Sequence, residues 1–146
     1  MREILFRGKR FDNGEWVESG NIIRFNPECG EDLVFIPGMN EKCISTHDEF
    51  DNIVAFIEVG FYKVNPKTVG QFTGLTDKNG KKIFEGDIVK AERICNRNSW
   101  MGCVVWWHGC FAIQGIRDSN NVPAIDLFKN YEVIGNIHDN PELLTG

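Results

Sequence analysis

The sequence predicts a mainly β fold, a small barrel or sandwich built from several hairpins with one or two short helices. Three observations predict this class. Short runs of alternating apolar residues are separated by clusters of turn residues. Glycine is frequent, at 15 of 146 residues, and is scattered as the turns between short strands require. Hydrophobic residues make up 42% of the chain and include eleven phenylalanines and four tryptophans, which argues for a folded core.

The chain begins with a predicted hairpin. Residues 3–7 form its first strand, Asp12-Asn13-Gly14 forms the turn, and residues 16–23 return alongside.

A short apolar strand is expected at residues 33–36, and Pro37-Gly38 ends it because proline interrupts strand pairing. Residues 39–51 are polar and mixed, which indicates a long loop with a short helical turn near Glu49. The apolar run over residues 53–57 fits either a strand or a helix.

The stretch Val69–Lys90 organises the rest of the chain. Two apolar runs flank Asp77-Lys78-Asn79-Gly80, where Asn-Gly suits a tight reversal with positive φ. Gly74 and Gly86 bracket this reversal and are predicted to be bends or bulges. A second turn follows at residues 85–87, where the Asp87 carboxylate can accept backbone N–H bonds. The stretch is therefore a structural hairpin, or else a binding loop with charged residues at its tip, namely Asp77, Lys78 and Lys81.

The C-terminal half contains a second strong hairpin about His108-Gly109. One or two helical turns are expected over residues 124–130. A short terminal helix begins at Asp139-Asn140-Pro141, with Asp139 or Asn140 as its cap. Four strands are expected in this half: 88–94, 102–107, 110–116 and 131–138.

The length of 146 residues predicts one domain, residues 1–146, with a subdivision near residues 60–68 into an N-terminal hairpin part and a C-terminal barrel part as the alternative.

The formal net charge is −5 without a basic stripe, so we do not expect nucleic-acid binding. No apolar run approaches the roughly 18 to 20 residues of a spanning helix, and the first residues carry no signal-peptide core. We therefore expect a cytoplasmic protein with no membrane association.

Three segments of the chain form a recognisable pattern. The central segment combines Gln71-Phe72-Thr73-Gly74-Leu75, Asp77, Asn79-Gly80 and Ile83-Phe84-Glu85-Gly86-Asp87-Ile88-Val89. The terminal segments are Arg2-Glu3-Ile4-Leu5-Phe6-Arg7, and Val133-Ile134-Gly135-Asn136-Ile137 followed by Asn140-Pro141-Glu142-Leu143-Leu144. Together they resemble the signature of the YopX family, whose members are small proteins encoded by bacteriophages and prophages of mainly Gram-positive bacteria. The resemblance implies a β-rich fold, a phage origin and residence in the host cytoplasm, and it carries over no catalytic residue.

No motif in the sequence indicates a metal, a cofactor or catalysis. The spacings C-x7-C and C-x4-H-x-C match no zinc template, and five irregularly spaced cysteines suit reduced thiols. A nucleophile pair of Cys103 or Cys110 with a histidine has no local signature. Neither phosphate-binding glycine motif occurs. The other candidate groups are the remaining cysteines, the three histidines and four carboxylates: Cys29, Cys43, Cys95, His47, His108, His138, Asp87, Asp118, Asp126 and Asp139.

Four aromatic residues form the one candidate interaction surface: Trp100, Trp106, Trp107 and Phe111. Neighbours in a strand face opposite sides, so Trp106 or Trp107 is either exposed or covered by another layer. The group is therefore two faces of a buried β-layer or a contact surface for a subunit or partner.

These observations favour a non-catalytic module that forms a homo-oligomer or binds a host or phage protein, with exposed edge strands that need covering. The first alternative is a nucleic-acid-binding phage regulator, and the second is an enzyme with an unrecognised site.

Overall fold

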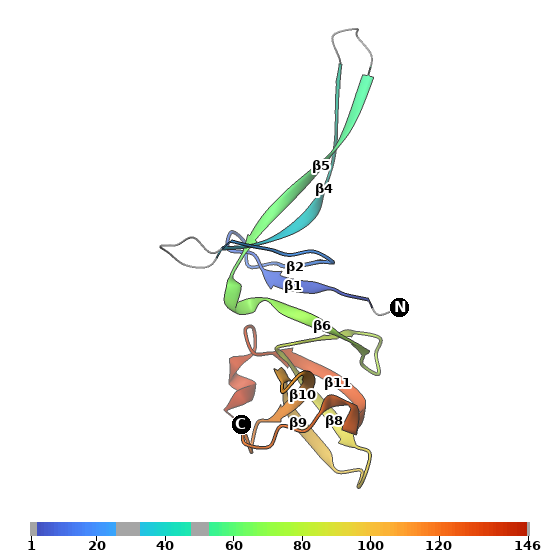
Figure 1. The fold of residues 1–146 in the computed structure, drawn as a ribbon, viewed down its shortest axis with the longest axis vertical. Coiled ribbons are helices and arrows are strands. Elements are labelled where there is room, and N and C mark those ends of the chain that lie inside the picture. The colour runs from blue at the N-terminus through green and yellow to red at the C-terminus, as the bar shows by residue number, and fades with distance from the viewer. Residues whose placement is uncertain (1–2, 26–32, 48–52, 146) are drawn as a thin grey trace. The chain divides into compact units, whose positions relative to one another are not determined.

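The computed structural model describes residues 3–25, 33–47 and 53–145, and for residues 25, 38–47 and 53–60 it describes the backbone alone. Within these ranges the chain forms eleven β-strands and three 3-10 helices, which confirms the predicted mainly β fold (Figure 1). The chain divides into two compact units. We call Leu5–Val69 the N-terminal unit, and Gly70–Gly146 with Met1–Ile4 the C-terminal unit.

The N-terminal unit begins with the predicted hairpin. Strands β1 (Phe6–Lys9) and β2 (Trp16–Ser19) pair in antiparallel fashion. Gly14 closes the turn with a φ of 69°, and its N–H donates to the Arg10 carbonyl at 3.1 Å. The first predicted hairpin is therefore confirmed.

The core of the N-terminal unit consists of Val34, Ile36 and Val64. A Cβ added to Gly8 would lie 2.9 Å from Val64 Cγ2, so the absence of a side chain lets β1 approach this core closely. The 3-10 helix η1 (Pro66–Thr68) follows, near the end of the unit.

Three further strands form the second sheet of this unit: β3 (Ile23–Phe25), β4 (Leu33–His47) and β5 (Ile53–Val64), with β4 in the middle. Strand β3 pairs only with residues 33–35 of β4. Beyond that point β4 pairs with β5 alone, and the described part of the sheet becomes a two-stranded ribbon (Figure 1). We call residues 36–47 and 53–62 the β4–β5 ribbon.

The prediction that the strand ends at Pro37-Gly38 is wrong. The Lys63 carbonyl accepts a hydrogen bond from the Phe11 N–H at 3.1 Å on the side of β5 away from β4. Because backbone groups alternate along an antiparallel pair, Pro37, which lies opposite Phe61, directs its nitrogen away from β5. Its missing N–H therefore interrupts no hydrogen bond of the ladder, and the strand continues.

The loop predicted over residues 39–51 is wrong for residues 39–47, which belong to β4. The ladder to β5 runs on until His47 lies opposite Ile53, with one register shift after Met39. The apolar, β-branched run over residues 53–57 is a strand, and it provides the partner that the polar segment needs. The helical turn predicted near Glu49 lies outside the described residues.

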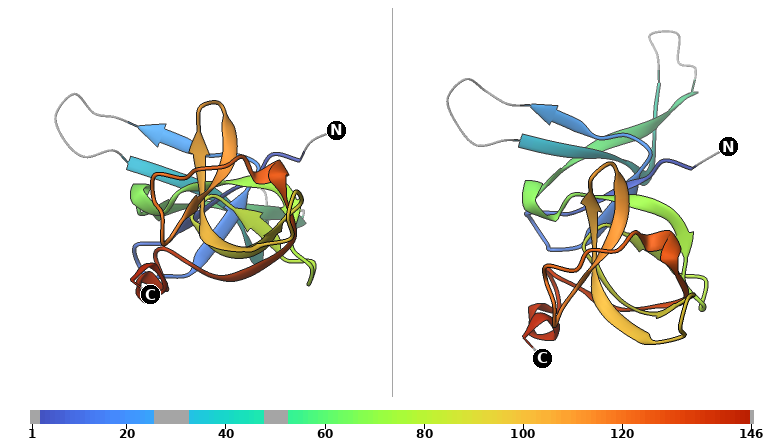
Figure 2. Two further views of the ribbon diagram at one scale, coloured as in Figure 1. Left: turned by 90° about the horizontal axis from the view of Figure 1, so that it is seen from below. Right: turned by 60° about the horizontal axis from the view of Figure 1, so that its bottom comes forward.

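The C-terminal unit contains a hairpin of β6 (Gly70–Thr76) and β7 (Lys82–Phe84) and a four-stranded antiparallel sheet (Figure 2). The strands of this sheet lie in the order β10 (Cys110–Gly115), β9 (Ser99–Trp107), β8 (Asp87–Arg93) and β11 (Phe128–Asn136). Buried side chains from the sheet, β7 and the 3-10 helix η2 (Ile125–Leu127) form the core: Ile83, Val89, Ala91, Val104, Phe111, Ile113, Ile125 and Phe128.

Other segments occupy part of each edge of this sheet. On β10, the Ile113 N–H donates to the Pro123 carbonyl at 3.0 Å and the Gly115 N–H to the Asn121 carbonyl at 3.1 Å. On β11, the Tyr131 carbonyl accepts a hydrogen bond from the Lys78 N–H at 2.9 Å. Strands β10 and β11 do not pair with each other, and the described strands form no closed barrel.

Both helices predicted in this half are single 3-10 turns. Helix η2 ends before Phe128, whose side chain is buried and whose backbone already pairs with Arg93 in the sheet. The terminal helix η3 (Pro141–Leu144) begins after Asn140, as predicted, but the Asn140 side chain makes no capping hydrogen bond. Its Oδ1 instead accepts from the Asn136 N–H at 3.2 Å. Among the described residues, no helix has the length or apolar character to cross a bilayer.

The two predicted turns of the central hairpin are confirmed, but the side chain of Asp77 at its tip is not solvated. Gly74 has a φ of 87° and lies at a register shift between β6 and β7, and Gly86 has a φ of 91°. The buried Asp87 carboxylate accepts a hydrogen bond from the Phe84 N–H at 2.8 Å, as predicted.

Asp77 is not a solvated tip residue but a buried carboxylate, 7% exposed. Its Oδ1 accepts from the N–H groups of Asn79 and Lys81, each at 2.9 Å. Its Oδ2 accepts from the Val133 N–H of β11 at 3.0 Å. A single side chain therefore closes the turn and attaches it to the edge of the sheet. Burial acts to raise the pKa of Asp77, but the three N–H donors and the charge of Lys81 outweigh it, and the pKa lies below 3.8.

Replacing Asp77 by alanine should lower the free energy of unfolding by about 2 to 3 kcal/mol, because buried N–H groups would lose their acceptor. Urea unfolding followed by tryptophan fluorescence measures this change. The matched control is Asp126→Ala, which removes an exposed carboxylate of the same unit and should change stability by less than about 0.5 kcal/mol. Equal effects of the two substitutions would contradict the assignment.

The contribution of Asp77 to stability should depend on pH. Because its pKa is lower in the folded protein than the ordinary 3.8, the carboxylate stabilises the fold above that value and loses this effect as pH falls through the lower folded value. The difference in unfolding free energy between the natural protein and Asp77→Asn should therefore be constant from pH 7 to 5 and shrink below pH 4. A difference that grows on acidification would show that the sign is wrong.

Candidate binding sites

The structure divides the four aromatic residues that the sequence groups together. Phe111, 6% exposed, belongs to the core, and Trp100 is partly buried against it with its ring 6.0 Å from that of Phe128. Trp106 and Trp107 are 53% and 47% exposed. Trp100 lies near the start of β9 and the two exposed tryptophans at its end, so the four side chains form no single surface.

The two exposed tryptophans lie at a tight turn between β9 and β10. His108 and Gly109 have φ angles of 47° and 82°, as a two-residue hairpin turn with two positive φ angles requires. Trp107 pairs with Cys110 across the turn, which confirms the predicted hairpin about His108-Gly109. We call residues 106–109 the tryptophan turn.

Ring contacts hold both indoles of the tryptophan turn. The ring of Trp106 meets the buried ring of Phe111 edge to face at 4.9 Å, and the ring of Trp107 meets that of His108 at 4.7 Å. Packing against the buried Phe111 therefore positions Trp106, whereas the ring partner of Trp107 is itself an exposed residue of the turn. About half of each indole remains exposed. Such a feature can bind an apolar cavity or the aromatic surface of another protein.

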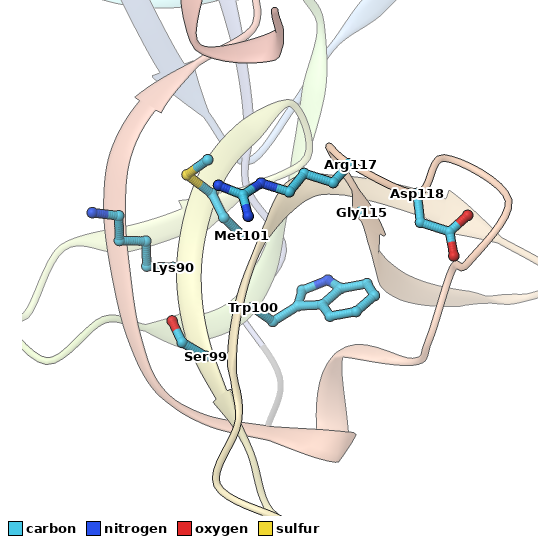
Figure 3. Close-up of a pocket in the computed structure, with 7 residues that line it drawn as sticks. All are labelled: Lys90, Ser99, Trp100, Met101, Gly115, Arg117 and Asp118. Atoms are coloured by element: carbon cyan, nitrogen blue, oxygen red, sulfur yellow. The ribbon is translucent and has the colours of Figure 1, made fainter. Parts of the chain in front are cut away.

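A second site is a pocket of about 580 Å³ at the opposite end of β9 (Figure 3). Its floor includes Gly115, where an added Cβ would lie 2.8 Å from Trp100 Cζ2, so a glycine is needed for the indole to lie there. The side chains that line it come from β8, β9 and the segment after β10: Lys90, Ser99, Trp100, Met101, Arg117 and Asp118.

Strand register and the turn after β10 assemble this pocket. Lys90 of β8 lies directly opposite Met101 of β9. After β10, the Ile116 N–H donates to the Met101 carbonyl at 3.2 Å, which brings Arg117 and Asp118 beside the strand. Figure 3 shows the Arg117 guanidinium directed to the side where Met101 and Lys90 lie, with Asp118 on the other side.

Two cations and one carboxylate line the pocket, and Glu132 of β11 lies opposite Lys90 in the ladder. Lys90 and Arg117 are exposed cations, and neither makes an ion pair or a side-chain hydrogen bond with the residues that the structure describes. Trp100 Nε1 is buried and has no acceptor among those residues. The Arg93 guanidinium lies 5.4 Å from the centroid of the Trp100 ring, outside the group that lines the pocket.

The thiols and histidines that the sequence offers for catalysis lie on several elements of the C-terminal unit: Cys103 is in β9, Cys110 in β10, His108 in the tryptophan turn, and His138 lies beside Gly86, with its Nε2 3.7 Å from an added Gly86 Cβ. Burial, with the charges of Asp87 and Glu85, raises the pKa of the Cys103 thiol to about 11. Cys110 is exposed, and its Sγ donates to the Trp107 carbonyl at 3.4 Å. No group of three metal-binding side chains occurs in the described part of the chain. The side chains of Cys29, Cys43 and His47 lie outside what the structure describes.

The four candidate carboxylates have separate environments. Asp87 is buried against its own turn, and Asp118 borders the pocket. Asp126 is exposed in η2, and Asp139 accepts a hydrogen bond from Asn136 Nδ2 at 3.0 Å.

Comparison with known proteins identifies the family. The profile described as YopX protein matches residues 5–145. The chain belongs to the YopX family. This YopX-family chain is also similar to a crystal structure of protein EF1440 from Enterococcus faecalis, with 25% sequence identity, a TM-score of 0.51 and coverage of 99% of both chains. No curated protein matches the sequence.

Sequence reasoning on this YopX protein missed the pocket. Lys90, Ser99, Met101 and Arg117 belong to no motif of a binding site, and the sequence suggests other roles for Trp100 and Asp118. The residues meet only through the pairing of β8 with β9 and the turn after β10. The sequence positions of Trp100, Lys90 and Arg117 match no known binding motif, so no local pattern indicates a site.

The cysteines should differ in reactivity because the thiolate is the nucleophile. In the native protein at pH 8, iodoacetamide should modify the exposed Cys95 and Cys110 at least about tenfold faster than the buried Cys103, whose pKa is about 11. Peptide mass spectrometry gives the rate at each site. Unfolding in urea is the control and should make the three rates similar. Fast native modification of Cys103 would contradict its assigned environment.

Proposed function

We propose that this YopX-family protein is a non-catalytic module that assembles with a second copy of itself. The tryptophan turn is the observation that carries the proposal. Tryptophan is enriched among the residues that contribute most binding energy at interfaces. Because the turn is held by strand pairing and ring contacts, binding through it costs little additional conformational entropy.

The β4–β5 ribbon supports the same proposal. Two-stranded hairpins are marginally stable alone in water. In the N-terminal unit, no described strand other than β4 pairs with β5. The first part of β5 is strongly apolar in sequence, with Ile53-Val54-Ala55-Phe56-Ile57. A second copy could supply pairing to the outer edge of β5 and cover this apolar segment.

We also propose that the gene belongs to a phage or prophage and that the protein acts in the host cytoplasm. Membership of the YopX family supports this setting, because the resemblance to that family implies a phage origin. A host or phage protein is the other partner class that an exposed aromatic turn would suit.

The full chain should be dimeric or larger in size-exclusion chromatography with light scattering, and Trp106→Ala/Trp107→Ala should move it toward the monomer. The double substitution should raise the dissociation constant by about thirtyfold or more, as for residues at the centre of an interface. Ile94→Ala is the matched control, because Ile94 is 55% exposed in the same unit but lies outside the turn.

The outcomes separate the parts of this proposal. Unchanged assembly in the double variant would exclude the tryptophan turn as the contact. A natural protein that is monomeric at every concentration would exclude self-assembly. If that monomer retains a host or phage protein from lysate and the double variant does not, the partner is a different protein.

A further inference from the structure

We propose that the pocket beside Trp100 binds a nucleoside monophosphate. The pocket is defined by Lys90, Ser99, Trp100, Met101, Arg117 and Asp118, and none of the tryptophan turn lines it. The proposal is therefore independent of self-assembly, and either can fail without the other.

The size of the pocket suits a small organic ligand. Its volume of about 580 Å³ lies within the roughly 300 to 1,000 Å³ that is usual for small-molecule sites. A bare inorganic ion would leave most of this space filled with water, whereas a base with its sugar and phosphate would occupy it. Trp100 and Met101 supply the apolar surface of the walls, against which a flat aromatic ring can be buried.

The charges indicate an anion with a single charged group. Lys90 and Arg117 are two cations without a partner in the described part of the chain, and Figure 3 places the Arg117 guanidinium on the same side as Lys90. Guanidinium and ammonium groups are the usual protein donors to phosphate. Asp118 adds one negative charge on the other side, which would repel the second and third phosphates of a longer polyphosphate.

The remaining polar groups suit a nucleobase and its sugar. The Asp118 carboxylate can accept hydrogen bonds from ring or exocyclic N–H groups, and the Ser99 hydroxyl can donate or accept. Trp100 can stack on a base, an interaction that every base permits.

The absence of a basic stripe argues for one nucleotide and against a nucleic-acid strand. The formal net charge of the chain is −5, and the two pocket cations are local. A strand would need a row of cations along its backbone, and its affinity would fall steeply with salt.

Titration of the full-length protein with GMP, AMP, CMP and UMP, followed by ¹H–¹⁵N NMR, tests the proposal. At least one of the four should cause a saturable shift of the Trp100 indole N–H signal, assigned with Trp100→Phe, and of the amides of residues 99–101 and 115–118. The nucleoside, which lacks phosphate, and ribose 5-phosphate, which lacks the base, should each bind at least about tenfold more weakly.

Single substitutions in the pocket test which side chains bind the phosphate group of the nucleotide. Lys90→Ala and Arg117→Ala should each weaken binding about tenfold, as expected for a lost hydrogen bond between charged groups. Lys67→Ala removes an exposed lysine of the N-terminal unit and should leave binding unchanged. Asp118→Asn should alter the relative affinities of the four nucleotides, whereas the two cation variants should weaken all four alike.

Three results would overturn the proposal. No saturable shift with any nucleoside monophosphate at millimolar concentration would show that the pocket is not a nucleotide site. Equal affinity for ribose 5-phosphate and the nucleotide would reduce it to a simple anion site. Tighter, strongly salt-dependent binding of a short single-stranded oligonucleotide would assign the surface to nucleic acid instead.

Discussion

The buried carboxylate of Asp77 is the interaction on which the architecture of the C-terminal unit depends. Its oxygens accept N–H groups from both sides of the central turn and from Val133 on β11. It therefore joins a local reversal to a strand more than fifty residues away in sequence. With Lys78 bound to Tyr131 beside it, the turn covers one edge of the sheet. The segment after residue 120 occupies part of the other edge, at Ile113 and Gly115 of β10.

Sequence reasoning succeeded where structure is determined by neighbours in the chain. The Asn79-Gly80 and His108-Gly109 reversals follow from positive φ, and the Asp87 hydrogen bond spans three residues. Sequence reasoning failed where the conformation of a residue depends on partners that are distant in the chain. Pro37 ends a strand only if its nitrogen faces a partner, and that depends on Lys63 and Phe11. The polar segment after it becomes a strand because β5 pairs with it. The burial of Asp77 likewise depends on β11.

The same limit explains what could be foreseen of the binding sites. An aromatic-rich hairpin was evident from residues 100–111, but alternation alone could not say which rings face the core. The ring of Phe111 faces the core, and it contacts the ring of Trp106, which lies opposite Phe111 in the ladder. The pocket was invisible because Lys90 reaches Met101 through register and Arg117 reaches it through a turn. Strand β9 thus carries one candidate site at each end, separated by the buried residues 102–104.

Pro37 also has a bearing on how such chains could grow into larger arrays. Its nitrogen faces the outer side of β4, at a position just beyond the end of β3. A strand laid along that margin would find no donor there, so sheet extension is discouraged on this flank. The opposite flank, along β5, is occupied near its end, where the Lys63 carbonyl accepts the Phe11 N–H and Val64 forms an isolated bridge with Arg10. Both flanks of the sheet therefore carry a feature that limits where a further strand can pair, as edge strands of natural sheets commonly do.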